Sequence, residues 1–225
     1  MPFDQSDVFV RSEANAWFTR NREALEKFDP ARDLALRLID LYGLRPRRVL
    51  EIGACTGMRL AALAERTGAM TVAVEPSAAA IAYGRVQFPG VRFVRGRAEA
   101  VALRAAFDLV IVNYVLHWID RDALLGVVGE IDRLVKDGGW LVIGDFHPAN
   151  RMALPYHHLP DGQVVTYKQD YAAVFTASGV YRPIATLEGD HITGRLDAAL
   201  PSIDRGAATL LGKSLTGGYV NVPYP

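Results

Sequence analysis

Short apolar segments alternate along most of the chain with segments of helical periodicity. The apolar segments are residues 47–52, 71–75, 91–96, 107–113 and 140–146. Between them, residues 58–68, 77–88 and 121–139 carry apolar side chains at helical spacing. Ser77 and Asp120 are predicted to cap the second and third of these helices, and Gly68 is predicted to end the first. This alternation predicts an α/β fold in which a doubly wound, mostly parallel sheet has helices on both faces.

The N-terminal part of the chain is predicted to be helical before this alternation begins. On residues 14–28, four large apolar side chains share one side of a helix: Trp17, Phe18, Leu25 and Phe28. The pair Asp29-Pro30 is typical of a helix cap followed by a proline in the first turn. It predicts a second helix that carries Leu34, Leu38 and Leu41 and ends near Gly43.

The alternation stops at residues 147–167, which are rich in proline, histidine and aromatic side chains. The segment is too long for an ordinary connection, so we expect a lid-like insertion. A helix is predicted over residues 168–179. Two strand-like segments, 180–188 and 207–215, follow it and are expected to pair as an antiparallel hairpin at the edge of the sheet.

Composition and charge narrow the class of protein. The chain has 225 residues, half of them hydrophobic, which fits one domain over residues 1–225. Its 25 basic and 25 acidic residues balance, so no long-range attraction draws it to nucleic acid or to an anionic membrane. Cys55 is the only cysteine, the first residues lack the pattern of a signal peptide, and no apolar segment approaches the roughly 20 residues that span a bilayer. We therefore expect a cytoplasmic protein with no membrane partner; a homodimer is possible but cannot be inferred.

The sequence VLEIGACTG, residues 49–57, places a carboxylate at the end of a strand and small residues in the turn that follows. Such a turn lets a ligand approach the backbone. A phosphate-binding loop would need a Gly-Lys-Ser/Thr ending, and a dinucleotide fingerprint would need Gly-x-Gly-x-x-Gly; neither is present. The spacing is Glu51-x-Gly53-x-Cys55-x-Gly57. Taken alone, it is also compatible with a simple connection between strand and helix.

Glu75 ends the next predicted strand, in the sequence VAVEPS. Nucleotide-binding βαβ units place an acidic residue at about this distance from the glycine turn. A carboxylate offers two acceptor oxygens to the two donors of a ribose diol. Glu75 is therefore predicted to bind ribose; the alternative is a carboxylate that caps a helix, a role that Ser77 already fills.

Four segments in this order resemble the motifs of class I S-adenosylmethionine (AdoMet)-dependent methyltransferases. They are the 49–57 turn, GRAEAV at 96–101, FDLVIVNYVLHWI at 107–119 and LLGVVGEIDRLVKDGGWLVIGDF at 124–146. Cys55 replaces the central glycine of the first motif, and Asp137 replaces a proline of the last. The resemblance covers about 100 residues. It implies a Rossmann-like fold with an antiparallel strand pair at the C-terminal end, and AdoMet as a methyl donor that leaves as S-adenosylhomocysteine (AdoHcy).

The resemblance also implies a set of cofactor-binding residues and a division of the chain. Residues 1–43 would form N-terminal helices that act as a lid, 46–146 the AdoMet-binding core, 147–167 the insertion, and 168–225 a C-terminal helix and edge strands. The residues expected to bind the cofactor are Glu51, Gly53, Ala54, Cys55, Gly57, Glu75, Pro76, Ala98, Glu99 and Asn113, with Trp17 and Arg20 from the lid. Asn21 is an alternative to Arg20.

The residues that could act on the methyl acceptor lie where the family places its acceptor pocket. His117 follows the fourth predicted strand, and histidine is the side chain best suited to proton transfer at neutral pH, so it could act as a general base; it could equally pack on the following helix. The insertion offers a competing group at Tyr156, His157 and His158. Together with Asp145 and His147, these residues could form the ligand set of a metal site, but their spacing in the sequence is irregular and no metal is predicted. Tyr167 and Tyr171 could line the pocket or belong to the core.

These features lead to one hypothesis and two alternatives. We expect an AdoMet-dependent methyltransferase that acts on an O, N or electron-rich C atom of a small molecule, such as a secondary metabolite or a sugar derivative. A tRNA or protein methyltransferase is the first alternative, although nucleic-acid enzymes usually present a basic face. A non-catalytic AdoMet-binding regulatory subunit is the second; it would retain the cofactor residues and lack a working acceptor pocket.

Overall fold

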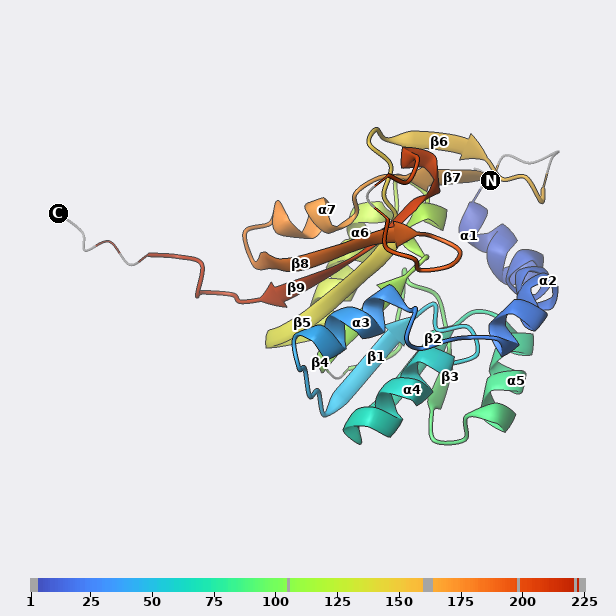
Figure 1. Cartoon of the computed structure of the whole chain (residues 1–225), viewed down its shortest axis with the longest axis horizontal. Coiled ribbons are helices and arrows are strands. Elements are labelled where there is room, and N and C mark those ends of the chain that lie inside the picture. Colours follow the sequence, from blue (N-terminus) through green and yellow to red (C-terminus); the bar gives the residue numbers. More distant parts are fainter. Residues whose placement is uncertain (1–3, 105, 160–163, 198, 221, 223–225) are drawn as a thin grey trace.

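In the computed structural model, residues 4–104, 106–159, 164–197, 199–220 and 222 are described, and seven strands within them form one sheet. Its strands are β1 (Arg48–Ile52), β2 (Met70–Glu75), β3 (Arg92–Arg95), β4 (Phe107–Asn113), β5 (Val135–Phe146), β8 (Tyr181–Asp190) and β9 (Arg205–Lys213). They lie in the order β3-β2-β1-β4-β5-β9-β8 (Figure 1). The first five are parallel; β9 pairs antiparallel to β5, and β8 pairs antiparallel to β9 at the edge of the sheet. The predicted fold class and the antiparallel pair are confirmed.

Helices cover both faces of the sheet because its central strands are apolar on both sides. In β4, Leu109 and Ile111 pack with α3 (Leu34–Leu41), α4 (Met58–Thr67) and α5 (Ala78–Gln87). The alternate residues Val110 and Val112 pack with α6 (Leu124–Leu134) and α7 (Ala172–Thr176). The uninterrupted apolar run of residues 107–113 is thus explained by burial on two faces.

The helix caps were predicted with mixed success. Ser77 caps α5, since its hydroxyl accepts from the backbone N–H of Ala80 at 3.0 Å, and Gly68 ends α4; both predictions are confirmed. The predicted start of α3 at Asp29-Pro30 is wrong. After Pro30 the chain makes a separate turn, and Asp33 caps α3 by accepting from the N–H of Leu36 at 2.9 Å.

The predicted cap at Asp120 is also wrong. A turn separates it from α6, and its carboxylate instead accepts from the backbone N–H of Gln5 at 2.9 Å. This contact ties the fourth-strand loop to the N-terminal helices, which are α1 (Gln5–Val8), the π-helical turn η1 (Phe9–Glu13) and α2 (Ala14–Glu26). The helix predicted over residues 14–28 is confirmed as α2.

The insertion at 147–167 contains a regular element that its proline content concealed. β6 (Met152–Pro155) and β7 (Val165–Lys168) pair antiparallel in a two-stranded ribbon. Figure 1 shows this ribbon and the N-terminal helices α1 and α2 gathered on one side of the molecule. The helix predicted over 168–179 shortens to α7. No helix in the described part of the chain is long and apolar enough to cross a membrane.

Candidate functional site

A cavity of about 1000 Å³ opens at the carboxyl ends of β1, β2 and β4. Residues of the N-terminal helices and of the β6–β7 ribbon contribute to its walls together with the strand ends. Thirteen of the predicted site residues line it, among them Trp17, Gly53, Ala54, Cys55, Glu75, Pro76, Ala98, Glu99, Asn113 and His117. Tyr156, His157 and His158 line it as well, whereas Glu51, Gly57 and Arg20 do not.

The backbone conformation and the close neighbours of the turn after β1 leave no room for large side chains. Gly53 has φ +72°, and a Cβ there would meet Cγ2 of Val115 at 2.3 Å. Gly57 has φ +77°, and a Cβ there would meet Cζ of Phe93 at 2.8 Å. Cys55 between them also has a positive φ, of 49°. The turn therefore needs small residues to fold, besides offering its backbone to the cavity.

Glu75 is fixed by backbone donors at the edge of this turn. Its Oε1 accepts from the N–H of Ser77 and its Oε2 from the N–H of Cys55, both at 2.8 Å. Burial raises the pKa of Glu75 to about 7, although the two N–H groups act against that rise. Each oxygen retains a second lone pair, so the carboxylate can still accept from a ligand in the cavity.

Glu51 lies beneath the cavity wall and does not line the cavity, and its contact with the cofactor stays a prediction. It is fully buried and forms an ion pair with Arg59 in the first turn of α4. Arg59 also contacts Asp33, at 2.9 Å. Burial raises the pKa of Glu51 to about 7 against the opposing pull of the Arg59 guanidinium. Arg59 itself lines the cavity, and the sequence analysis missed it because only the fold pairs it with two acidic residues.

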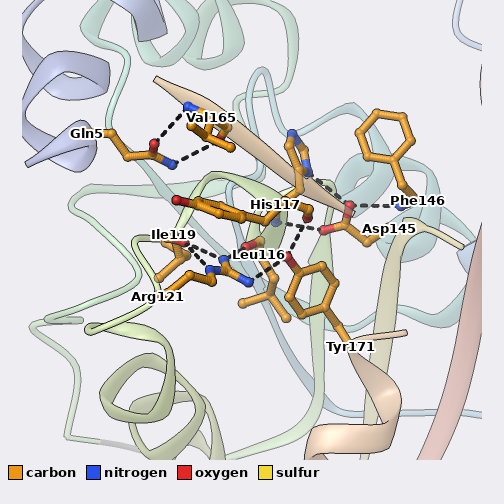
Figure 2. Close-up of polar contacts among 10 residues, drawn as sticks. Gln5, Leu116, His117, Ile119, Arg121, Asp145, Phe146, Val165 and Tyr171 are labelled. Carbon is orange, nitrogen blue, oxygen red and sulfur yellow. Dashed lines mark hydrogen bonds and ion pairs between the residues drawn. The ribbon is translucent and has the colours of Figure 1, made fainter. Parts of the chain in front are cut away.

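His117 is held by a buried carboxylate at the end of β5 (Figure 2). Its Nδ1 lies 2.9 Å from Oδ1 of Asp145, and its backbone N–H donates to Oδ2 at 3.2 Å. The N–H of Phe146 donates to Oδ1 at 2.8 Å. Because an ionised carboxylate only accepts, the Nδ1 of His117 carries the proton and its Nε2 keeps a lone pair. Asp145 is a functional candidate that the sequence suggested only as a metal ligand.

Arg121 supports the loop that carries His117 by hydrogen bonds to its backbone. Arg121 donates to the carbonyls of Leu116 at 2.9 Å and Ile119 at 3.1 Å, and to the hydroxyl of Tyr171 at 3.1 Å (Figure 2). Tyr171 is part of the core, and the guanidinium lies 4.2 Å from the centre of the Tyr167 ring. The His117 loop is therefore rigidly positioned before any ligand binds.

Comparison with known proteins identifies the central part of the chain. Residues 50–143 match a family described as "Methyltransferase domain". These residues are thus similar in sequence to a methyltransferase domain. The chain is 34% identical over 132 residues to a trans-aconitate 2-methyltransferase of Deinococcus radiodurans, covering 56% of this chain and 48% of that protein. It thus spans about half the length of this relative.

Solved methyltransferases share the fold of the chain. The 1,6-didemethyltoxoflavin-N1-methyltransferase of Burkholderia thailandensis, solved with its substrate and AdoHcy, has a TM-score of 0.73 at 19% identity, covering 95% of this chain and 92% of that one. The N-methyltransferase NodS of Bradyrhizobium japonicum, solved with AdoHcy, has a TM-score of 0.62 at 14% identity, covering 81% and 85%. The predicted resemblance to class I methyltransferases is confirmed, and AdoMet is the cofactor of such a domain.

The residues of the methyltransferase domain suit that cofactor. The cavity is at the upper end of the roughly 300–1000 Å³ usual for small-molecule sites, which leaves room for AdoMet and a small acceptor. Glu75, Glu99 and Asn113 place two carboxylates and an amide at or just after the ends of β2, β3 and β4. Their oxygens can accept from the ribose hydroxyls and the adenine amino group of that cofactor.

The N-terminal helices close over this part of the methyltransferase. The hydroxyl of Ser6 donates to Glu99, and Arg97 pairs with Asp7 at 2.7 Å. Arg20 does not face the cavity as predicted; it pairs with Glu13 and donates to the hydroxyl of Tyr156 at 3.1 Å. Its role is therefore to join α2 to the segment after β6.

The histidines of the insertion have a different setting from His117. Tyr156 is buried against Trp118, at 4.6 Å between ring centres, and its hydroxyl donates to Glu13 at 2.8 Å. His157 and His158 are exposed, with ring centres 3.9 Å apart. Desolvation and the nearby Arg20 lower the pKa of His158. No carboxylate within the described residues orients either ring, and no cluster there of three or more His, Cys, Asp and Glu side chains could hold a metal.

The affinity for AdoHcy is expected to rise roughly tenfold between pH 6 and pH 8, since a carboxyl group with a pKa of about 7 is roughly one-tenth ionised at pH 6 and roughly nine-tenths ionised at pH 8. Ribose hydroxyls donate best to an ionised Glu75, whose pKa of about 7 must fall when they bind. Binding therefore releases a proton, and affinity is lost as the pH falls through 7. Calorimetric titration across this range measures it. Glu75→Gln should bind more weakly with a flat profile; an equally steep profile in that variant would assign the proton elsewhere.

Proposed function

We propose that the chain transfers a methyl group from AdoMet to an O, N or electron-rich C atom of a small molecule, with His117 as general base. The observation that carries this proposal is that His117, oriented by Asp145, lines the same cavity as the residues predicted to bind AdoMet. AdoMet, when bound, supplies an activated methyl group, so positioning accounts for much of the rate. A base is needed only where the acceptor must lose a proton.

The chain's own residues would act on the acceptor as follows. Nε2 of His117 takes the proton, and the buried Asp145 carboxylate stabilises the imidazolium that results. The N-terminal helices and the β6–β7 ribbon keep water from the cavity. We further propose that residues 1–225 work as a single domain in a reducing compartment such as the cytoplasm, where the free Cys55 is stable.

The two alternative functions are less well supported. A tRNA or protein methyltransferase needs an open face for its substrate, whereas the residues proposed to act on the acceptor line a cavity of about 1000 Å³. The chain also has no net charge that would attract a nucleic acid. A regulatory subunit has no need of a buried histidine held by a carboxylate. Incubation with AdoMet and a metabolite panel, with mass detection of the methyl gain and of AdoHcy, tests the proposal; methylation of RNA or protein alone would overturn it.

AdoHcy is expected to raise the melting temperature by about 5–10 °C at one hundred times its dissociation constant. Mass action stabilises the native state by about 2.7 kcal/mol at that concentration, and each kcal/mol corresponds to about 2–4 °C in a chain of this size. NADH carries the same adenosine group and should cause no shift, because the turn after β1 lacks the dinucleotide spacing. Thermal-shift measurements compare the two ligands. Stabilisation by NADH without AdoHcy would contradict the assignment of the cofactor.

A further inference from the structure

Lys168, the last residue of β7, presents an ammonium group on the cavity wall. It is partly buried, and its Nζ lies 3.9 Å from the centre of the Phe146 ring. Within the described residues its ammonium group has no hydrogen bond and no ion pair. Desolvation lowers the pKa of this amine, while Asp204 and Asp145 act against that fall from a longer distance. An ammonium group that lines the cavity without an acidic partner is a candidate for binding an anion.

Three further rings pack around the Phe146 ring that this ammonium group contacts. The Phe146 ring centre lies 5.0 Å from that of His117 and 5.3 Å from those of Tyr114 and His191. Each of these residues lines the cavity. Nδ1 of His191 donates to the carbonyl of Asp204 at 2.7 Å, which fixes that ring as well. Lys168 and the proposed base thus contact the same phenyl ring, within a wall that suits a flat ligand.

Nearby carboxylates do not neutralise Lys168. Asp145 is occupied by two donors of His117 and one of Phe146. Asp204 lies beyond ion-pair distance. AdoMet, when bound, would bring the positive charge of its sulfonium into the same cavity. An acceptor with a negative charge would balance both cations, in a setting where low polarity strengthens the attraction.

We propose that the acceptor is a planar, unsaturated carboxylic acid whose carboxylate is bound by Lys168 and whose separate hydroxyl or amino group faces His117. The proposal rests on the methyl transfer proposed above and adds the class of acceptor to it. The carboxylate anchors the molecule, and Phe146, Tyr114 and His191 contact its flat framework. The group to be methylated is then held at the other end, near the base.

Matched pairs of acids and amides test the role of the charge. The probes are 4-hydroxybenzoate with 4-hydroxybenzamide, 2-hydroxybenzoate with 2-hydroxybenzamide, and 4-hydroxycinnamate with its amide. Their binding to the protein saturated with AdoHcy is measured by calorimetry. We expect the acid to bind about ten- to hundredfold more tightly than the amide in at least one pair, as for one charge-assisted contact. Lys168→Met should reduce this preference to about twofold or less, and Lys168→Arg should retain most of it.

Lys136→Met is the matched control, because Lys136 pairs with Asp108 at the opposite end of β5 and does not line the cavity. It should keep the preference of the unmodified protein. If no pair shows a preference for the acid, or if Lys168→Met retains it, the proposed acceptor class is wrong. Binding of AdoHcy and methylation of neutral acceptors would then leave the methyltransferase proposal intact. Failure of the unmodified protein to bind AdoHcy would overturn both.

Discussion

Replacing His117 with asparagine is expected to lower turnover by roughly 10²–10⁴, the usual contribution of a positioned general base. Asparagine keeps a polar side chain that can still donate to Asp145, so the loop below it should be preserved. It removes the Nε2 lone pair that would accept the proton. His117 lies four residues after the end of β4, and its ring is hydrogen-bonded to Asp145 of β5. It is not one of the residues predicted to bind AdoMet, so the affinity for AdoHcy should change little. Steady-state kinetics with calorimetric titration of AdoHcy separate the two effects.

The matching variants in the insertion are His157→Asn and His158→Asn, which should retain most of the activity. Both rings line the cavity but are exposed and lack a carboxylate to orient them within the described residues. Near-normal turnover in His117→Asn with a collapse in one of these two would move the base to the insertion. Near-normal turnover in all three would mean that positioning suffices, as for an acceptor already nucleophilic at neutral pH.

The sheet could be predicted from the sequence because its strands are buried on both faces. A run such as residues 107–113 has no solvent side, so local composition alone specifies it. The errors arose where local signals compete. Asp29-Pro30 and Asp33 both resemble helix starts, and the later one wins because the chain turns between them. The β6–β7 ribbon depends on pairing between residues more than ten positions apart, such as Met152 with Lys168, which periodicity in a short segment does not reveal.

The site was predictable as a set of positions but not as a set of contacts. Strand ends of a parallel sheet meet at one edge, which brings Glu75, Asn113 and His117 to a common cavity. The pairing of side chains there depends on contacts between distant elements of the fold. His117 bonds to a residue 28 positions away, and Glu51 pairs with Arg59 and does not line the cavity. Lys168 went unnoticed for the same reason, because only the ribbon brings it over Phe146.

The second large effect is expected from Asp145→Asn, which should lower turnover at neutral pH by roughly 10²–10⁴. Serine proteases offer the parallel, because an amide in place of their buried carboxylate leaves the geometry intact but favours the wrong histidine tautomer. Here the new side-chain NH₂ would donate to Nδ1 of His117, so that the proton moves to Nε2, where the acceptor's proton should go. The imidazolium would also lose its counter-charge.

A positioning role for Asp145 makes a prediction that a purely structural role does not. Asp145→Asn should move the acid limb of the pH–rate profile to lower pH and reduce kcat more than it raises KM, because the ring is still present but is a weaker base. Asp170→Asn is the control, since that carboxylate lies 3.9 Å from the ring of His147, outside the cavity, and should leave the profile unchanged. A lower melting temperature in Asp145→Asn with an unshifted profile and normal kcat would assign the carboxylate to folding alone. An unshifted profile with a large fall in kcat would mean that Asp145 acts by positioning the His117 loop and that the ring takes no proton.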